Sequence, residues 1–244
     1  MKLVIFSDMD GTLLDSNYSF KDAEKALDLI KKKKIALVLS SSKTRAELEF
    51  YRKKMRNKHP FIVENGGAIF IPKNYFSRNF KYISMNNYKV IEIGTYYPKL
   101  RRALSKLKET FPEIKGFGDM SIKELADDCG LTLEEAELAK KREYDEAFKM
   151  KKENWGKAKK MIKELRFYYT EGGRYYHILG KNDKGKAVKI LTKLYKQEFK
   201  KIKTVSLGDS ENDVPMFKNT DSHFRVKGPK DWNKIVLNLL NNQL

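Results

Sequence analysis

Short apolar runs that stop at polar clusters recur along the first 70 residues of the chain. Residues 3–6, 35–39 and 61–63 are each long enough for one buried strand of a parallel sheet. Between the first two runs, apolar residues at positions 23, 26, 27 and 30 have the spacing of one buried helical face. A further apolar strand is expected at 204–207, after a helix with its apolar face at 187–194. This alternation predicts an α/β fold with a parallel sheet.

The pattern changes near residue 82, where the chain becomes denser in aromatic residues and loses the strand–helix alternation. The elements predicted there are strands at 89–94 and 114–117, helices at 99–111, 121–128, 132–141 and 158–165, and paired strands at 167–170 and 174–179 about Glu171-Gly172-Gly173. We therefore expect an α+β cap domain at 83–179, inserted into a core domain formed by 1–82 and 180–244.

Two carboxylates, Asp8 and Asp10, directly follow the first predicted strand. Residues two apart in an extended segment project to the same side, so both can face one small volume at the carboxyl edge of the sheet, where α/β proteins bind ligands. Two close anions repel unless a cation lies between them. Mg²⁺ prefers oxygen ligands and keeps waters that a phosphate can displace, which favours a magnesium site. An ordinary Asp-Gly turn is the alternative interpretation of these residues alone.

Polar clusters also follow the other predicted strands of the core. Ser41-Ser42-Lys43 offers hydroxyls, backbone amides and a cation to a phosphate, although a serine-rich helix cap would look the same. Glu64-Asn65-Gly66 ends the third strand at the same edge, where a simple hairpin connection is the alternative. After the strand at 204–207, Asp209 and Asp213 are four residues apart and can turn toward one cation, with a spacing that does not fit a calcium loop.

Four segments, in order along the chain, resemble the four motifs of the haloacid dehalogenase superfamily of phosphotransferases. They are Asp8-Met9-Asp10-Gly11-Thr12-Leu13-Leu14, Ser41 at the end of the second strand, Lys184-Gly185, and Gly208-Asp209-Ser210-Glu211-Asn212-Asp213. The resemblance implies a Rossmann-like parallel sheet core with an inserted α+β cap of the C2B type. Relatives with this cap often have Thr-Gly-Arg where this chain has Ser41-Ser42-Lys43, so the role of Lys43 is left open.

The same resemblance implies roles for the motif residues. Asp8 would be the nucleophile and Asp10 the general acid/base, while Ser41 and Lys184 would hold the phosphate. Mg²⁺ would be bound by Asp8, the backbone carbonyl of Asp10 and Asp209, with Asp213 acting directly or through water. The reaction would then be phosphate-ester hydrolysis through an aspartyl-phosphate intermediate.

One stretch of the cap, Lys141 to Phe148, alternates charged and aromatic residues. We expect several of its side chains to line a cavity or the surface, since they cannot all be buried in one face; a solvated helix end is the alternative. The stretch, together with Arg174 and His177, resembles the cap of mannosyl-3-phosphoglycerate phosphatases, in which a proline usually stands at the position of Ala147. The predicted substrate-binding residues are, from the core segments after the second and third strands, Ser41, Ser42, Lys43, Glu64, Asn65 and Gly66, and, from the cap, Arg142, Glu143, Arg174 and His177.

That narrower resemblance implies hydrolysis of 2-O-mannosyl-3-phosphoglycerate to mannosylglycerate and phosphate. Two alternatives are kept: another sugar phosphatase of the superfamily, acting on sucrose phosphate or hexose phosphates, and a non-catalytic module that binds phosphate or nucleic acid. Intact Asp8, Asp10, Lys184 and Asp209 argue against the non-catalytic module.

Composition and net charge limit the classes of molecule that the protein is expected to bind. The 244 residues carry a net charge of +19, which attracts anions such as a phosphorylated sugar-glycerate. No nucleic-acid-binding motif accompanies this charge, so we expect no nucleic-acid partner. The longest apolar runs are too short for a membrane span or a signal peptide, so we expect no membrane contact and a cytoplasmic location. The abundance of Lys and Glu is typical of a thermophilic source. The sequence does not predict the oligomeric state.

Overall fold

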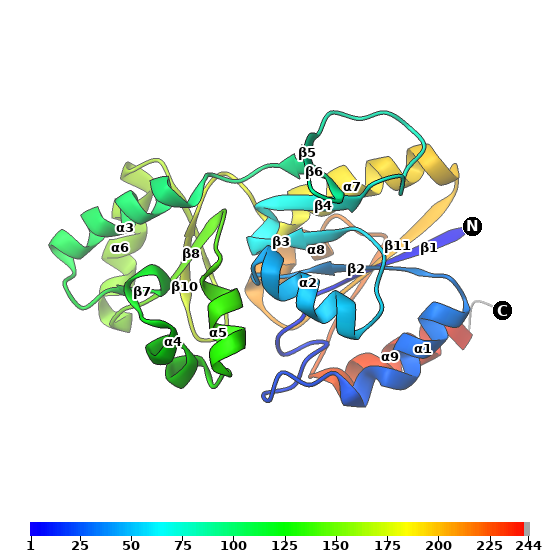
Figure 1. Ribbon diagram of the computed structural model, residues 1–244, viewed down its shortest axis with the longest axis horizontal. Coiled ribbons are helices and arrows are strands. Elements are labelled where there is room, and N and C mark those ends of the chain that lie inside the picture. Colours follow the sequence, from blue (N-terminus) through cyan, green and yellow to red (C-terminus); the bar gives the residue numbers. More distant parts are fainter. Residues whose placement is uncertain (242–244) are drawn as a thin grey trace.

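The computed structural model describes residues 1–241 and contains two β-sheets (Figure 1). The larger sheet has eight strands, in the spatial order β12 (Ser222–Arg225), β11 (Ile202–Gly208), β1 (Lys2–Ser7), β2 (Ala36–Ser40), β3 (Phe61–Val63), β4 (Ala68–Pro72), β6 (Tyr88–Glu92) and β5 (Ile83–Met85). Strands β12 to β3 pair in parallel, and β4, β6 and β5 extend the sheet with antiparallel pairs. The predicted parallel core sheet is therefore confirmed, with an antiparallel extension.

Side chains of β1 alternate between two apolar layers, because successive residues of a strand point to opposite faces. Leu3 and Ile5 pack with α1 (Glu24–Lys32), α2 (Arg45–Lys54) and α9 (Pro229–Asn241), whereas Val4 and Phe6 pack with α7 (Lys184–Phe199) and α8 (Val214–Phe217). Figure 1 shows α7 above the sheet and α1 with α9 below it. Covering both faces buries β1 from Leu3 to Ser7 and fixes where its carboxyl end points.

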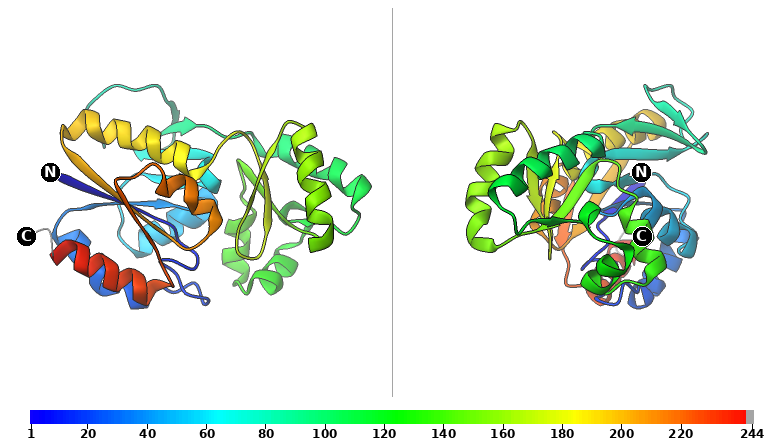
Figure 2. Two further views of the ribbon diagram at one scale, coloured as in Figure 1. Left: turned by 180° about the vertical axis from the view of Figure 1, so that it is seen from behind. Right: turned by 60° about the vertical axis from the view of Figure 1, so that its left-hand side comes forward.

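The smaller sheet has four antiparallel strands, in the order β7 (Lys115–Gly116), β8 (Asp145–Lys149), β10 (Tyr176–Leu179) and β9 (Tyr168–Glu171). Helices α3 (Tyr97–Thr110) and α6 (Trp155–Glu164) pack on it through one apolar cluster, and α4 (Ile122–Cys129) and α5 (Leu133–Lys140) through another. The predicted hairpin about Glu171-Gly172-Gly173 is confirmed by the β9–β10 pair. Figure 2 shows, from behind, this smaller unit lying beside the larger one.

The pairing of the larger sheet indicates that the cap begins later in the chain than residue 83, the start expected from the sequence. Strands β5 and β6 lie at 83–92, which the sequence prediction assigned to the cap, yet they pair with each other and β6 pairs with β4 of the core. We propose that the core comprises 1–94 and 180–241 and that the cap begins at Thr95. The two chain connections between core and cap, at Thr95 and at Gly180, lie against each other, since a Cβ atom on Gly180 would lie 2.3 Å from Oγ1 of Thr95.

Most predicted helices are found close to their expected bounds, and α7, which carries the apolar face predicted at 187–194, begins at Lys184. Side-chain caps explain two of the starts, since Ser121 before α4 and Thr132 before α5 each form a capping box. In residues 1–241, each helix is too short or too polar to cross a membrane.

Candidate active site

Three carboxylates gather at the carboxyl edge of the larger sheet. Asp8 follows β1, and Asp209 and Asp213 follow β11, its parallel neighbour, in which Leu207 is the register partner of Ser7. One carboxylate oxygen from each of the three residues lies within 4.8 Å of the others. This set consists only of oxygen ligands and carries excess negative charge, so it fits a hard divalent cation. The carboxylate of Asp10, predicted beside this site, is not part of the cluster.

Gly11 allows the first motif to pass close to the cluster. Its φ is +70°, and a Cβ atom at this position would lie 2.7 Å from Oδ2 of Asp209. Glycine is the residue that adopts a left-handed conformation without steric cost and leaves this space free. Nearby, the hydroxyl of Thr12 donates to Oδ1 of Asp209 over 3.1 Å and orients that carboxylate.

Lys184, the first residue of α7, supplies a buried cation to the cluster. Its Nζ lies 2.7 Å from Oδ1 of Asp8 and 2.6 Å from Oδ1 of Asp213. Burial alone would lower the pKa of this ammonium, but Asp213 and Asp8 hold it above its ordinary value. Burial also raises the pKa of Asp8, an effect that the charge of Lys184 only partly offsets. A lysine at a helix start is disfavoured by the helix dipole, and Lys184 has two carboxylate partners that offset this cost.

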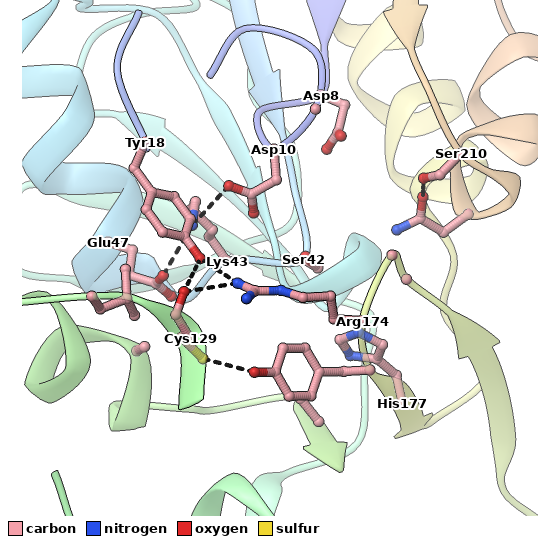
Figure 3. Close-up of a pocket in the computed structure, with 18 of the residues that line it drawn as sticks. Asp8, Asp10, Tyr18, Ser42, Lys43, Glu47, Cys129, Arg174, His177 and Ser210 are labelled. Atoms are coloured by element: carbon pink, nitrogen blue, oxygen red, sulfur yellow. Dashed lines mark hydrogen bonds and ion pairs between the residues drawn. The ribbon is translucent and has the colours of Figure 1, made fainter. Parts of the chain in front are cut away.

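Lys43 connects the second motif to Asp10. Its Nζ lies 3.1 Å from Oδ1 of Asp10 and 3.4 Å from Oε1 of Glu47, and it stands 4.8 Å from the ring centroid of Tyr18. Glu47 is fixed by the capping box that starts α2 at Thr44. Lys43 therefore holds the carboxylate of Asp10 from the side opposite the acidic cluster (Figure 3).

A cavity of about 500 Å³ lies between the core carboxylates and the cap. Of the predicted site residues, the structure brings these to its wall: Asp8, Asp10, Ser42, Lys43 and Asp209 from the core, and Arg142, Arg174 and His177 from the cap. Figure 3 shows Arg174 and His177 facing Asp8 and Asp10 across this space. Among the predicted residues, the core side of the cavity therefore carries three carboxylates and the cation Lys43, whereas the cap side carries Arg142, Arg174 and His177.

Other predicted site residues lie outside the wall of this cavity. Lys184 and Asp213 stand behind Asp8, and Ser41 is fully buried, with its Oγ accepting the backbone N–H of Lys43 over 3.2 Å. Glu64, Asn65 and Glu143 lie at the junction of core and cap, whereas Gly66 packs inside the core, where a Cβ atom would lie 2.1 Å from the backbone carbonyl oxygen of Asp183.

The side chain of Glu64, a core residue, binds the backbone of the cap. Its carboxylate accepts the N–H of Tyr144 over 2.7 Å and the N–H of Glu143 over 2.9 Å. Burial raises the pKa of Glu64 to about 8, despite the opposing charge of Arg142. On the opposite side of the junction, Glu143 pairs with Arg45 of α2 over 3.2 Å.

The stretch from Lys141 to Phe148 is more buried than its charges suggested. Arg142, Tyr144, Asp145 and Glu146 are all buried, and only Arg142 and Ala147 line the cavity. We expected several of these side chains to line a cavity or the surface because they cannot all be buried in one face; β8 is instead covered on both faces, and each buried charge has a partner. Asp145 pairs with Arg142 over 2.9 Å, and Glu146 pairs with an arginine of α3 over 2.7 Å.

The sequence analysis missed Tyr18. Its hydroxyl donates to the backbone carbonyl of Cys129 over 3.1 Å and accepts a hydrogen bond from Nη2 of Arg174 over 2.9 Å. A loop of the core thus contacts two segments of the cap at the mouth of the cavity (Figure 3). The only signal in the sequence was an aromatic residue shortly after the first motif.

A family model described as haloacid dehalogenase-like hydrolase matches residues 5–228. The chain belongs to this family of hydrolases. It is 46% identical to the glucosyl-3-phosphoglycerate/mannosyl-3-phosphoglycerate phosphatase of Methanococcoides burtonii, with 98% of each chain covered. It is 41% identical to the mannosyl-3-phosphoglycerate phosphatase of Pyrococcus furiosus, with 91% of this hydrolase and 90% of the relative covered.

A solved structure of a sugar phosphatase from haloacid dehalogenase subclass IIB has the same fold. It superposes with a TM-score of 0.64 at 15% identity, covering 100% of this hydrolase and 99% of that chain. The predicted fold class, a Rossmann-like core with an inserted α+β cap, is therefore confirmed. The superfamily resemblance drawn from the four motifs is confirmed as well.

Proposed function

We propose that this hydrolase removes the phosphate from 2-O-mannosyl-3-phosphoglycerate, giving mannosylglycerate and phosphate. The observation that carries the proposal is the likeness to phosphatases named for this substrate at 41–46% identity over nearly the whole chain, cap included. One of these relatives is also named for the glucosyl compound. The substrate class is therefore a 3-phosphoglycerate that bears a hexose.

The charges around the cavity suit such a substrate. The phosphate and the glycerate carboxylate bring about three negative charges, and the cationic side chains that line the cavity are Lys43, Arg142 and Arg174. Arg174 uses Nη2 for Tyr18 and Cys129, which leaves its other nitrogens for a carboxylate or a hydroxyl. The absence of a nucleic-acid partner and the cytoplasmic location stay predictions from the sequence.

We assign the chemical steps to Asp8 and Asp10. A carboxylate oxygen of Asp8 attacks phosphorus, the bond from phosphorus to the glycerate oxygen breaks, and Asp10 gives that oxygen a proton. Water then attacks the aspartyl phosphate while Asp10 takes a proton from it, which releases phosphate and restores Asp8. Lys184 neutralises part of the charge on Asp8, and Lys43 keeps Asp10 in place.

The acidic cluster of Asp8, Asp209 and Asp213 would hold Mg²⁺, which supplies positive charge to the phosphate oxygens when bound. The predicted phosphate contact of Ser41 stays a prediction, since its hydroxyl is buried beside the backbone of Lys43. Ser42 is the serine of this motif that lines the cavity.

The test is phosphate release by the purified protein in the presence of Mg²⁺. The panel comprises mannosyl-3-phosphoglycerate, glucosyl-3-phosphoglycerate, 3-phosphoglycerate, sucrose phosphate and glucose 6-phosphate, with Asp8→Asn as the inactive control. We expect kcat/KM for the two hexosyl-3-phosphoglycerates to exceed the others by at least about 100-fold, because substrates that lack the hexose or the glycerate carboxylate would leave polar groups of the site unpaired. Equal rates across the panel would replace the proposal with a general sugar phosphatase. Activity retained by Asp8→Asn would contradict the assignment of the nucleophile.

A further inference from the structure

Asp145, on β8 of the cap, is a fully buried carboxylate that the proposed chemical steps do not use. It accepts hydrogen bonds from Nδ1 of His177 over 2.8 Å and from Nδ2 of Asn65 over 2.7 Å, and it forms an ion pair with Nη2 of Arg142 over 2.9 Å. Burial raises the pKa of Asp145, but His177 and Arg142 outweigh it and hold the pKa below its ordinary value. Asp145 is therefore an ionised acceptor inside the cap.

The contact with Asp145 fixes the ring of His177. Because an ionised carboxylate only accepts hydrogen bonds, Nδ1 of His177 carries a hydrogen and Nε2 is the nitrogen left for another partner. A Cβ atom on Gly172 would lie 3.0 Å from Nε2, and both Gly172 and His177 line the cavity. Nε2 thus lies at the cavity wall beside the β9–β10 turn, with the ring next to Arg174 (Figure 3).

Asp145 is in turn anchored to the core. Asn65, which donates to it, accepts from Nδ2 of Asn212 over 3.1 Å, and Asn212 lies between Asp209 and Asp213 in the chain. Direct hydrogen bonds therefore run from the acidic loop of the core, through Asn65 and Asp145, to His177 in the cap. The position of Nε2 is set by the core as well as by the cap.

We propose that Asp145 is a positioning residue that holds Nε2 of His177 toward the cavity, where His177 hydrogen-bonds the hexosyl-glycerate part of the substrate. The assignment rests on the proposed function for the identity of that part. His177 belongs to the cap wall, whereas the attacking carboxylate of Asp8 belongs to the core wall, so the contact is with the portion of the substrate remote from phosphorus. Asp145 acts through His177 and does not touch the substrate.

The test compares two substrates in the full-length protein with Mg²⁺. Mannosyl-3-phosphoglycerate has a hexosyl-glycerate part that can hydrogen-bond His177, whereas p-nitrophenyl phosphate has only the phosphate and a flat nitrophenyl ring. Asp145→Asn and His177→Ala are each expected to lower kcat/KM for the first by roughly 10- to 100-fold, the cost of a hydrogen bond with a charged partner. For p-nitrophenyl phosphate, kcat/KM of both variants should stay within about 3-fold of that of the unmodified protein, because this substrate makes no hydrogen bond to His177 that could be lost. The double variant should be no worse than His177→Ala alone.

Glu146→Gln is the matched control. Glu146 follows Asp145 on β8, is equally buried and pairs with Arg101 over 2.7 Å, but within the described residues it forms no hydrogen bond or ion pair with His177. It should leave the ratio of the two kcat/KM values unchanged. If Asp145→Asn does not fold, the selective loss in His177→Ala still supports the assignment of His177.

Two results would overturn the inference. An equal fall for both substrates would mean that Asp145 and His177 only hold the two domains together. Losses that multiply in the double variant would mean that Asp145 acts independently of His177. If the unmodified protein shows no preference for hexosyl-glycerates, the proposed function fails, and the same ratio is then measured with its best sugar phosphate, so the two failures remain separate.

Discussion

Replacing Lys184 with methionine removes the buried cation that separates two carboxylates. The ammonium is fully buried, and its contacts of 2.7 Å with Asp8 and 2.6 Å with Asp213 would both be lost. Breaking a buried ion pair typically costs about 3–5 kcal/mol, because the partner charge stays buried without compensation. Asp8 can relieve part of this cost by taking up a proton, since burial already raises its pKa. We therefore expect a loss near 3 kcal/mol, or roughly 6–12 °C in Tm for a chain of this size.

The loss should be measured as free energy of unfolding by urea at pH 7 in the presence of EDTA. At this pH the stabilisation by Lys184 is fully present, because its pKa in the folded protein lies above its ordinary value and is reached only at higher pH. Lys186→Met, in the same helix, is the matched control: its side chain is 44% exposed and stands 3.5 Å from Asp183, so the change should stay within about 0.5 kcal/mol. Adding Asp8→Asn to Lys184→Met should recover part of the stability. Equal stability of the Lys184 and Lys186 variants would refute the reasoning.

Two further predictions concern the junction and the acidic cluster. The first compares the unmodified protein with Glu64→Gln: the unmodified protein should lose stability relative to the variant as pH rises from about 4.5 to about 8, because its folded state favours the protonated acid. Urea unfolding at pH 5 and pH 9 should show that the difference in unfolding free energy between the two proteins changes by on the order of 3 kcal/mol in favour of the variant. A difference that stays constant would contradict the prediction. In Gly11→Ala, the added methyl group would displace Asp209, so the Mg²⁺ concentration for half-maximal activity should rise about 10-fold, with a loss of about 1–2 kcal/mol in stability. Gly130→Ala has the same sign of φ with open space around it, so it should lose similar stability and leave the Mg²⁺ requirement unchanged.

The core of the site was predictable because its parts are local. A short apolar strand followed at once by Asp8 or Asp209 is visible in a few residues, and parallel pairing then brings the ends of β1 and β11 together. The capping preferences of Ser121 and Thr132 are local as well. Physical rules with a range of a few residues were therefore enough to bring Asp8 and Asp209 to one edge of the sheet, whereas the roles of Ser41 and Lys184 came from the superfamily resemblance.

The parts of the fold and of the site that could not be predicted from the sequence depend on contacts between distant segments. Periodicity identified a strand near 89–94 but could not assign it to a sheet, since its partner β4 is chosen by pairing in space. Tyr18 and Arg174 are 156 residues apart, and no pattern in the sequence links them. Charges such as Arg142 and Asp145 look like surface residues until their partners are known, because a paired charge can be buried.

The chain enters and leaves the smaller domain at one place, where Gly180 packs against Thr95. Domains whose ends lie together can be inserted or exchanged with little disturbance to the host. The acidic cluster and its lysine all belong to the larger domain, whereas Arg142, Arg174 and His177 belong to the smaller one. Chimeras within the family therefore have a natural joint at Thr95 and Gly180, provided that the grafted piece, residues 95–179, keeps the backbone N–H groups that bind Glu64 and an acceptor for Asn65.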